Sequence, residues 1–237
     1  MKPLAYVCAA LVFASGTATA GARNSGGSSD YFAGIPRPVR AADFGSFPLD
    51  EISRDVDPRY VRCPDLELVT YRGAHIPFNR PTRIYVPFQA HLEEFEELVR
   101  SVAIEVYGRA PTRLVHGGTY HCREVRHVPG LLSEHGFGDA IDVHGFDFGA
   151  AARNEPLPAG LPLRLRHRFE VRVLAHWDAH GAVGDVHAHF FARLRAELEA
   201  RPRLFRGMLG PGYPGHENHL HLDMAPWALF WMRNTGR

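Results

Sequence analysis

The stretch GYPGHENHLHLD, residues 212–223, contains three histidines, a glutamate and an aspartate. Such side chains can bind a metal ion or move protons. His216-Glu217 suggests the His-Glu-x-x-His motif of zinc proteases, whose two histidines stand four positions apart on a helix. Here His219 follows His216 by three positions, and the prolines and glycines at 211–215 oppose a helix. We therefore expect an extended chain instead.

In a strand, side chains alternate between the two faces of the sheet. His219, His221 and Asp223 then share one face, while Leu220 and Leu222 enter the core. Two imidazoles at positions i and i+2 can both approach a single ion. One of them can ligate the ion while the other remains beside it.

A second candidate is SEHGFGDAIDVHGF, residues 133–146, in which His135 and Asp142 flank two glycines. The glycines allow a tight turn, and a short strand is expected after it. In that strand Ile141 and Val143 would point into the core and Asp142 the opposite way, with the small Ala140 beside it. Alternatively, His135 is a loop residue and Asp142 a turn former.

Together the two stretches offer His135, Asp142 and one histidine of the pair His219/His221. Two histidines and one carboxylate with an open fourth position are typical of catalytic zinc. Such an ion would lower the pKa of its bound water toward ~7 and polarise a carbonyl. The remaining histidine could take the proton of the water or stabilise the oxyanion.

Other histidine pairs lack this arrangement. His187 and His189 fall on a predicted helix, where positions i and i+2 point about 200° apart, so they cannot chelate together. His176 and His180 suit one helix face, but no carboxylate or cysteine completes a ligand set.

The elements that must position these residues indicate an α+β fold. Apolar periodicity predicts helices over residues 88–107 and 185–200, and strict alternation predicts a half-buried strand over 163–174. The arginines on the outer face of that strand could contact an acidic glycan or peptide, or simply be solvated. No βαβ rhythm is present, so we expect a small antiparallel sheet that carries the zinc site, with helices packed on it.

Three segments are expected along the chain. Residues 1–20, with Lys2, an apolar run and Ala-Thr-Ala before the cleavage point, have the pattern of a secretory signal peptide and are too short for a membrane span. Residues 21–60 have the composition of a flexible linker or loosely packed arm, and residues 61–237 form one folded domain. The protein is therefore expected to be exported, to the periplasm or the exterior.

The charge of the chain bears on its partners, and its cysteine content bears on disulfide formation. Lys2 is the only lysine, so removal of the leader leaves 26 arginines against 26 acidic residues. A neutral chain has no general attraction for nucleic acid, which argues against that partner. Cys63 and Cys122 would remain, either as two free buried thiols or as a disulfide that closes a loop of about sixty residues.

At these motifs the chain resembles the bacterial extensin-like C-terminal domain family. GGTYHCREV (117–125), LLSEHGFGDAIDVHGF (131–146) and MLGPGYPGHENHLHLD (208–223) follow the order of that family. More broadly, His-x6-Asp followed by His-x-His resembles the zinc metallopeptidase group of lysostaphin, the D-Ala-D-Ala peptidases and the hedgehog signalling domain. The resemblance covers residues 60–225.

The resemblance implies roles for individual residues. The zinc ligands would be His135, Asp142 and His221, and the catalytic histidines would be His219 and His216. Ser133 and Arg123 would contact substrate. The D-Ala-D-Ala dipeptidases carry a glutamate base three residues before the last ligand, where this chain has Asn218.

The expected function is therefore that of an exported zinc metallopeptidase. It would hydrolyse D-amino-acid amide bonds in peptidoglycan peptides, as a D,D-endopeptidase or a D,D-carboxypeptidase. The alternative is a non-catalytic domain that binds cell-wall peptide and has a vestigial or structural zinc site.

Overall fold

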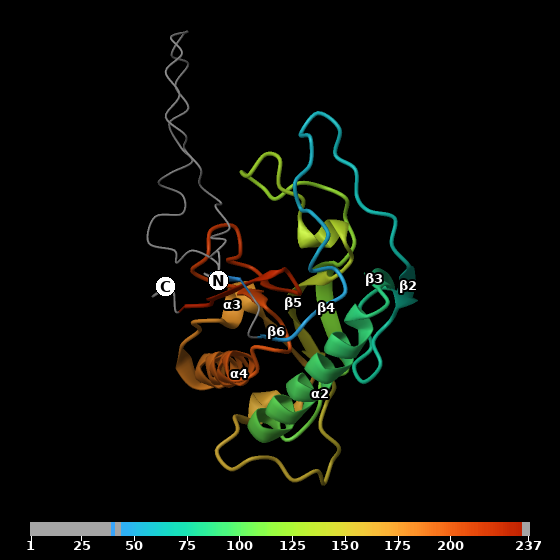
Figure 1. Ribbon diagram of the computed structural model, residues 1–237. Helices are drawn as coiled ribbons and strands as arrows, with labels where there is room; N and C mark the ends of the chain where they lie inside the picture. Colours follow the sequence, from blue (N-terminus) through green and yellow to red (C-terminus); the bar gives the residue numbers. More distant parts are fainter. Residues whose placement is uncertain (1–38, 41–43, 234–237) are drawn as a thin grey trace, which may run out of the picture.

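A seven-stranded sheet forms the centre of the computed structural model, which describes residues 39–40 and 44–233 (Figure 1). The strands lie in the order β1-β9-β7-β8-β5-β4, and β6 also pairs with β5. All pairs are antiparallel except the parallel pair β7–β9. The strand bounds are β1 Val39–Arg40, β4 Arg113–Gly118, β5 Ala140–Phe148, β6 Phe169–Arg172, β7 Gly207–Leu209, β8 Leu220–Asp223 and β9 Trp227–Trp231. A separate hairpin joins β2 (Leu68–Tyr71) to β3 (Thr82–Tyr85).

Two long helices, α2 (Phe88–Tyr107) and α4 (Gly181–Glu199), contact each other and share a core with the sheet (Figure 1). Tyr107 on α2 packs against Phe148 on β5 and Phe190 on α4, with ring centroids 4.8 and 5.4 Å apart. The helix predicted over 88–107 is confirmed, and Gly108 ends it in the left-handed conformation that glycine favours. The second predicted helix begins four residues earlier than expected. The α+β class is confirmed.

The side chains of strand β5 alternate between the core and the open face of the sheet. Its central position comes from pairing with β4, β6 and β8. Ile141 and Val143 are fully buried in the core, whereas Asp142 and His144 are partly exposed on the opposite face. This is the alternation predicted from the sequence, so the sheet presents Asp142 away from the helices.

The strand predicted over 163–174 is largely wrong. Only Phe169–Arg172 is a strand, because it pairs with Gly145–Phe148 at the end of β5, while the first part of β5 pairs with β8. Upstream, Leu163–Arg166 forms a 3-10 turn, η3, and Leu163 is 78% exposed rather than buried. Downstream, Val173–His176 forms the short helix α3. Alternation without a partner strand therefore did not produce a strand.

The N-terminal segment 44–56 packs against the domain. Phe47 and Leu49 belong to the hydrophobic core, and Arg54 is buried. The packed part of the chain thus begins before residue 61. The predicted signal peptide, residues 1–20, lies outside the described residues, as does most of the predicted linker before residue 44.

Cys63 and Cys122 form a disulfide, with Cα atoms 5.7 Å apart, so the bridged alternative is the one found. None of the helices in the described part of the chain is long and apolar enough to span a membrane.

Candidate metal centre

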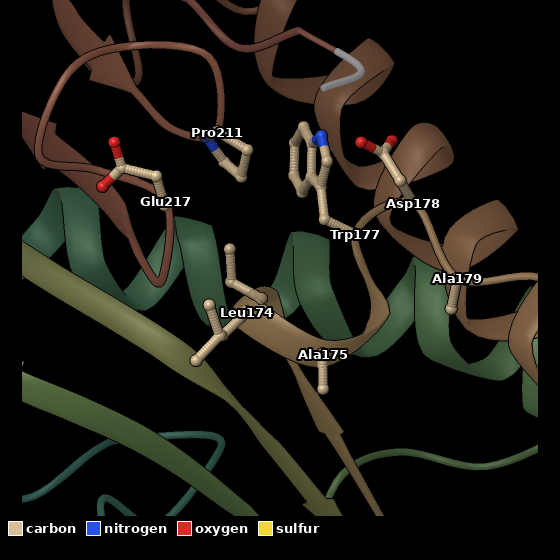
Figure 2. Close-up of a pocket in the computed structure, with 8 residues that line it drawn as sticks. Leu174, Ala175, Trp177, Asp178, Ala179, Pro211 and Glu217 are labelled. Carbon is tan, nitrogen blue, oxygen red and sulfur yellow. The ribbon is translucent and has the colours of Figure 1, made fainter. Parts of the chain in front are cut away.

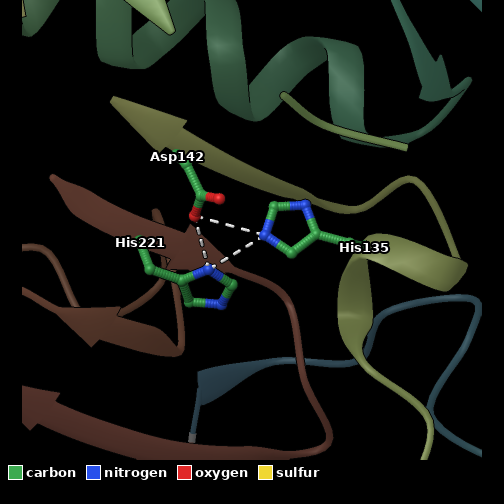
Figure 3. Close-up of side chains that lie close together, drawn as sticks. All are labelled: His135, Asp142 and His221. Atoms are coloured by element: carbon green, nitrogen blue, oxygen red, sulfur yellow. Dashed lines mark hydrogen bonds and ion pairs between the residues drawn. The ribbon is translucent and has the colours of Figure 1, made fainter. Parts of the chain in front are cut away.

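Three side chains converge on one point at the open face of the sheet (Figure 3). The Nε2 atom of His135 lies 3.2 Å from Asp142 Oδ1 and 3.2 Å from His221 Nδ1. His221 Nδ1 lies 3.0 Å from the same carboxylate oxygen. Within the described residues, this is the single group of three potential ligand residues close enough to share an ion.

Backbone structure explains why the three residues meet. Asp142 on β5 and His221 on β8 are direct antiparallel partners in the sheet. His135 lies in the 3-10 turn η2 (Glu134–Gly136), just before β5, where Ser133 caps the turn by accepting a hydrogen bond from the His135 amide. One ligand therefore comes from each of two paired strands, and the third from the turn that leads into one of them.

The other nitrogen of each histidine has an oxygen partner. His135 Nδ1 lies 2.7 Å from the Thr119 carbonyl oxygen, which can only accept, so this nitrogen carries the hydrogen. His221 Nε2 lies 2.8 Å from Asp223 Oδ2 and donates to that carboxylate. Such bonds set the tautomer and aim of metal-binding histidines. They leave Nε2 of His135 and Nδ1 of His221 turned toward Asp142.

The donor set fits a zinc ion. Zinc bonds of about 2.0–2.2 Å in a tetrahedron require ligand atoms about 3.3–3.6 Å apart, slightly more than the 3.0–3.2 Å separations in the triad. Burial alone would raise the pKa of Asp142, but His135 and His221 hold it well below its usual range. The carboxylate is therefore ionised and can ligate a cation.

Two further histidines lie beside the triad. His219 Nε2 is 3.4 Å from Asp142 Oδ1, and the ring of His216 lies 4.7 Å from that of His219. Burial is the main cause that lowers the pKa of His219 to about 3 and that of His216 to about 4. Both imidazoles are therefore neutral near pH 7. The structure thus brings together all five residues predicted as ligands or catalytic histidines.

A polar cleft of about 300 Å³ is lined by two residues of the triad, His135 and Asp142. Arg123 lies at this cleft, as does Arg80, which donates a hydrogen bond to the Gly117 carbonyl. Ser133, by contrast, is buried beneath His135 and caps the turn. Its predicted contact with substrate stays a prediction. The residues that line the cleft are Arg80, Thr82, Gly117, Gly118, Thr119, Tyr120, His121, Arg123, His135 and Asp142.

A smaller pocket of about 80 Å³ lies apart from the triad, between α3 and the loop that precedes β8 (Figure 2). Glu217 lines this pocket together with Trp177 and Pro211, and none of the three triad residues does. Glu217 is thus not one of the groups that converge on the candidate ion. The His-Glu dipeptide therefore does not place a glutamate base at this centre.

Sequence reasoning assigned no role to His144, Asp223 or Thr119. His144 stands two positions after Asp142 on the same strand face, and its ring lies 5.5 Å from that of His219. Alternation could have identified His144, and it did place Asp223 on the face of His221, although without a role. The Thr119 carbonyl is a backbone group contributed by another part of the chain, for which the sequence holds no signal.

The histidine pairs that were predicted not to bind metal have other partners. His187 lies 2.9 Å from the Tyr107 hydroxyl oxygen, and His176 accepts a hydrogen bond from the Arg172 amide. Neither belongs to a group of ligand residues able to share an ion. Both therefore serve packing.

Comparison with known proteins finds a match for the part of the chain that carries two of the three candidate ligands. No curated protein and no solved structure shows significant similarity to the chain. A family model described as extensin-like protein C-terminus matches residues 50–155. That range contains His135, Asp142 and Arg123 but ends before His216, His219 and His221. Over residues 50–155, the chain is therefore similar to the extensin-like protein C-terminus family.

Proposed function

We propose that the protein is an exported zinc metallopeptidase that hydrolyses D-amino-acid amide bonds in peptidoglycan peptides. The observation that carries the proposal is the convergence of His135 Nε2, Asp142 Oδ1 and His221 Nδ1, with two neutral histidines beside them. The substrate class rests on the resemblance of His-x6-Asp and the later His-x-His to the zinc metallopeptidase group. Export rests on the pattern of residues 1–20.

His135, Asp142 and His221 would hold the zinc. When bound, a zinc ion with an open position supplies a Lewis acid that polarises a carbonyl and makes water more acidic. The protein groups then determine where charge and protons go. His219 lies within reach of the carboxylate ligand and is neutral, so it can accept the proton released as water attacks the amide.

His216 is placed to assist His219. Its ring lies 4.7 Å from that of His219 and 5.6 Å from that of His221, and its own Nδ1 is 3.1 Å from the Pro214 carbonyl oxygen. This bond fixes the hydrogen on Nδ1 and leaves Nε2 as an acceptor. His216 would therefore either accept a proton from His219 or stabilise it in the protonated form.

The arginines of the cleft would orient the peptide. Arg80 and Arg123 bring two guanidinium groups to a polar cleft that also contains His135 and Asp142. Guanidinium groups bind carbonyl and carboxylate oxygens with directed hydrogen bonds. A peptide held there would present an amide beside the triad.

Two substitutions separate metal binding from proton transfer. His221→Ala should lose zinc, measured by metal analysis of the purified folded protein, because one of three ligands is removed. His219→Ala should retain about one zinc per chain and lose at least about 100-fold in turnover, the typical contribution of a positioned acid or base. Full activity in His219→Ala would show that another group moves the proton.

Digestion of purified peptidoglycan, with fragments identified by mass spectrometry, tests the reaction itself. Cleaved cross-links would indicate an endopeptidase, and loss of terminal D-alanine a carboxypeptidase. Zinc-loaded, folded protein that binds peptidoglycan but yields no fragments would instead identify the non-catalytic cell-wall peptide-binding domain. Absence of zinc from well-folded protein would refute the metal centre.

A further inference from the structure

We propose that Arg54, in the N-terminal segment 44–56, is a positioning residue for the metal ligand His135. This inference rests on the proposed metal centre and concerns how its turn is held. Arg54 is 80 positions before its main partner in the sequence and does not line the cleft. It acts through Glu134 and Phe137, the first residue and the C-cap of the turn η2, which carries His135 and is called the ligand turn below.

The guanidinium group of Arg54 forms a bidentate ion pair with Glu134, the residue before His135. Nε donates to Oε1 at 3.0 Å and Nη2 donates to Oε2 at 2.9 Å. Both side chains are at most 5% exposed. Two parallel bonds between planar groups fix orientation as well as distance, which a single contact cannot do.

The same guanidinium lies over the ring of Phe137, 4.3 Å from its centroid. Glu134 begins the turn η2 and Phe137 ends it, so Arg54 contacts both ends of the turn that carries His135. Its remaining nitrogen, Nη1, donates to the carbonyl oxygens of Leu49 and Ile52. The arginine is therefore itself held in place by its own segment.

Backbone bonds extend this attachment. The Leu132 amide donates to the Arg54 carbonyl at 2.7 Å, and the Val56 amide donates to the Gly130 carbonyl at 2.9 Å. Segment 44–56 thus runs beside residues 130–134 immediately before the ligand. A shift of the arginine would be transmitted to the direction in which His135 Nε2 points, which determines the separation of the three ligand atoms.

The test compares zinc affinity, by competition with a chelator, and the visible spectrum of the Co²⁺-loaded protein. Arg54→Lys keeps the positive charge but cannot form the two parallel hydrogen bonds to Glu134. Arg54→Met with Glu134→Leu replaces the buried ion pair by apolar side chains, a change that buried ion pairs often tolerate without loss of stability. We expect both variants to bind zinc about tenfold more weakly or worse, the range found when groups that orient ligands are lost, with an altered Co²⁺ spectrum.

Arg206→Lys is the matched control. Arg206 is also buried and also binds the N-terminal segment, through Asp50 at 3.2 Å and Gly45, but its side chain bonds to no residue of the ligand turn. We expect this variant to lose stability in urea and to keep wild-type zinc affinity while folded.

Wild-type affinity in the folded double variant would overturn the proposal. So would an equal loss of affinity in Arg206→Lys, because any loosening of the segment would then suffice. If the wild-type protein takes up no zinc, the metal centre fails and the role of Arg54 fails with it. That outcome is distinguishable because it appears before any substitution is made.

Discussion

His221 turns Nδ1 toward Asp142 while its Nε2 donates to Asp223. Burial alone would lower the pKa of His221, but hydrogen bonds to the Asp142 and Asp223 carboxylates raise it to about 10. Asp223 is almost fully buried, and its Oδ1 also accepts a hydrogen bond from the Ala225 amide. Asp223 thus keeps the hydrogen on Nε2 of His221, and an ion at the proposed centre would displace the proton on Nδ1.

Asp223→Ala should weaken zinc binding by about 10- to 100-fold, because the imidazole loses the partner that orients it. Asp223→Asn, whose amide oxygen can still accept from Nε2, should lose less. Chelator competition on both folded variants measures the effect. Equal affinity in wild type and Asp223→Ala would mean that packing alone aims the ring.

At the scale of residues, the sequence indicated the candidate ligand residues but not the groups that orient their side chains. Alternation along residues 140–143 and 219–223 placed Asp142 and His221 on open strand faces, and both placements are confirmed. Thr119 and Arg54 act through contacts that join distant parts of the chain. Such contacts depend on the completed fold and leave no local periodic signal.

At the scale of elements, α2, α3 and α4 meet around His187. This side chain is 3% exposed, and its ring lies 4.6 Å from that of His176 on α3. Burial, followed by the neighbouring His176, lowers the pKa of His187 from 6.5 to about 4. The folded protein therefore keeps this imidazole neutral at a pH where the unfolded chain would protonate it.

Stability should consequently fall with pH in a defined window. Below pH 6.5 the unfolded state binds the proton first, so stability is lost until pH 4, where the folded state also protonates. The loss from this group is on the order of 3 kcal/mol. His187→Gln should show a correspondingly flatter dependence in urea unfolding between pH 7 and pH 4. Parallel curves for the two proteins would contradict this assignment.

Prediction of elements succeeded where the signal was local. The apolar positions of residues 88–107 repeat with helical spacing, and glycine at 108 ends the helix, so both bounds follow from the sequence. Residues 163–174 alternate as a strand would, but only four of them pair with β5, whose first part pairs with β8. A strand needs a free partner edge, and which edges are free is a tertiary property.

At the scale of the whole molecule, the disulfide Cys63–Cys122 joins the segment after the buried N-terminal part to the loop that follows β4. It also lies beside the ligand turn, since a Cβ atom added to Gly136 would come within 2.8 Å of Cys63 Sγ. The bridge thus constrains the unfolded chain and packs on the folded site.

Replacing both cysteines by serine should lower the free energy of unfolding by about 3–4 kcal/mol, because the bridge closes a long loop. Urea unfolding of the oxidised wild type and the double variant measures this difference. Thiol titration of the unreduced, denatured wild type should detect neither Cys63 nor Cys122. A reactive thiol from either residue would show that the bridge does not form in the purified protein.

The N-terminal segment 44–56 packs against the domain, although the sequence predicted a flexible linker there. Its composition is that of a linker, and its apolar residues, among them Phe47 and Leu49, show no sustained period. They are buried because the completed domain offers a surface to receive them. Truncation at residue 61 would therefore remove part of the core and the buried Arg54 as well.

The direct pairing of Asp142 with His221 has a consequence for how the protein acquires its fold. A slip of one residue between β5 and β8 would turn a leucine, Leu220 or Leu222, toward the aspartate in place of the histidine. A chain in that state would lack the third ligand of the proposed metal centre. On that proposal, zinc present during refolding would stabilise only the chains that have the correct strand register, and so raise their yield.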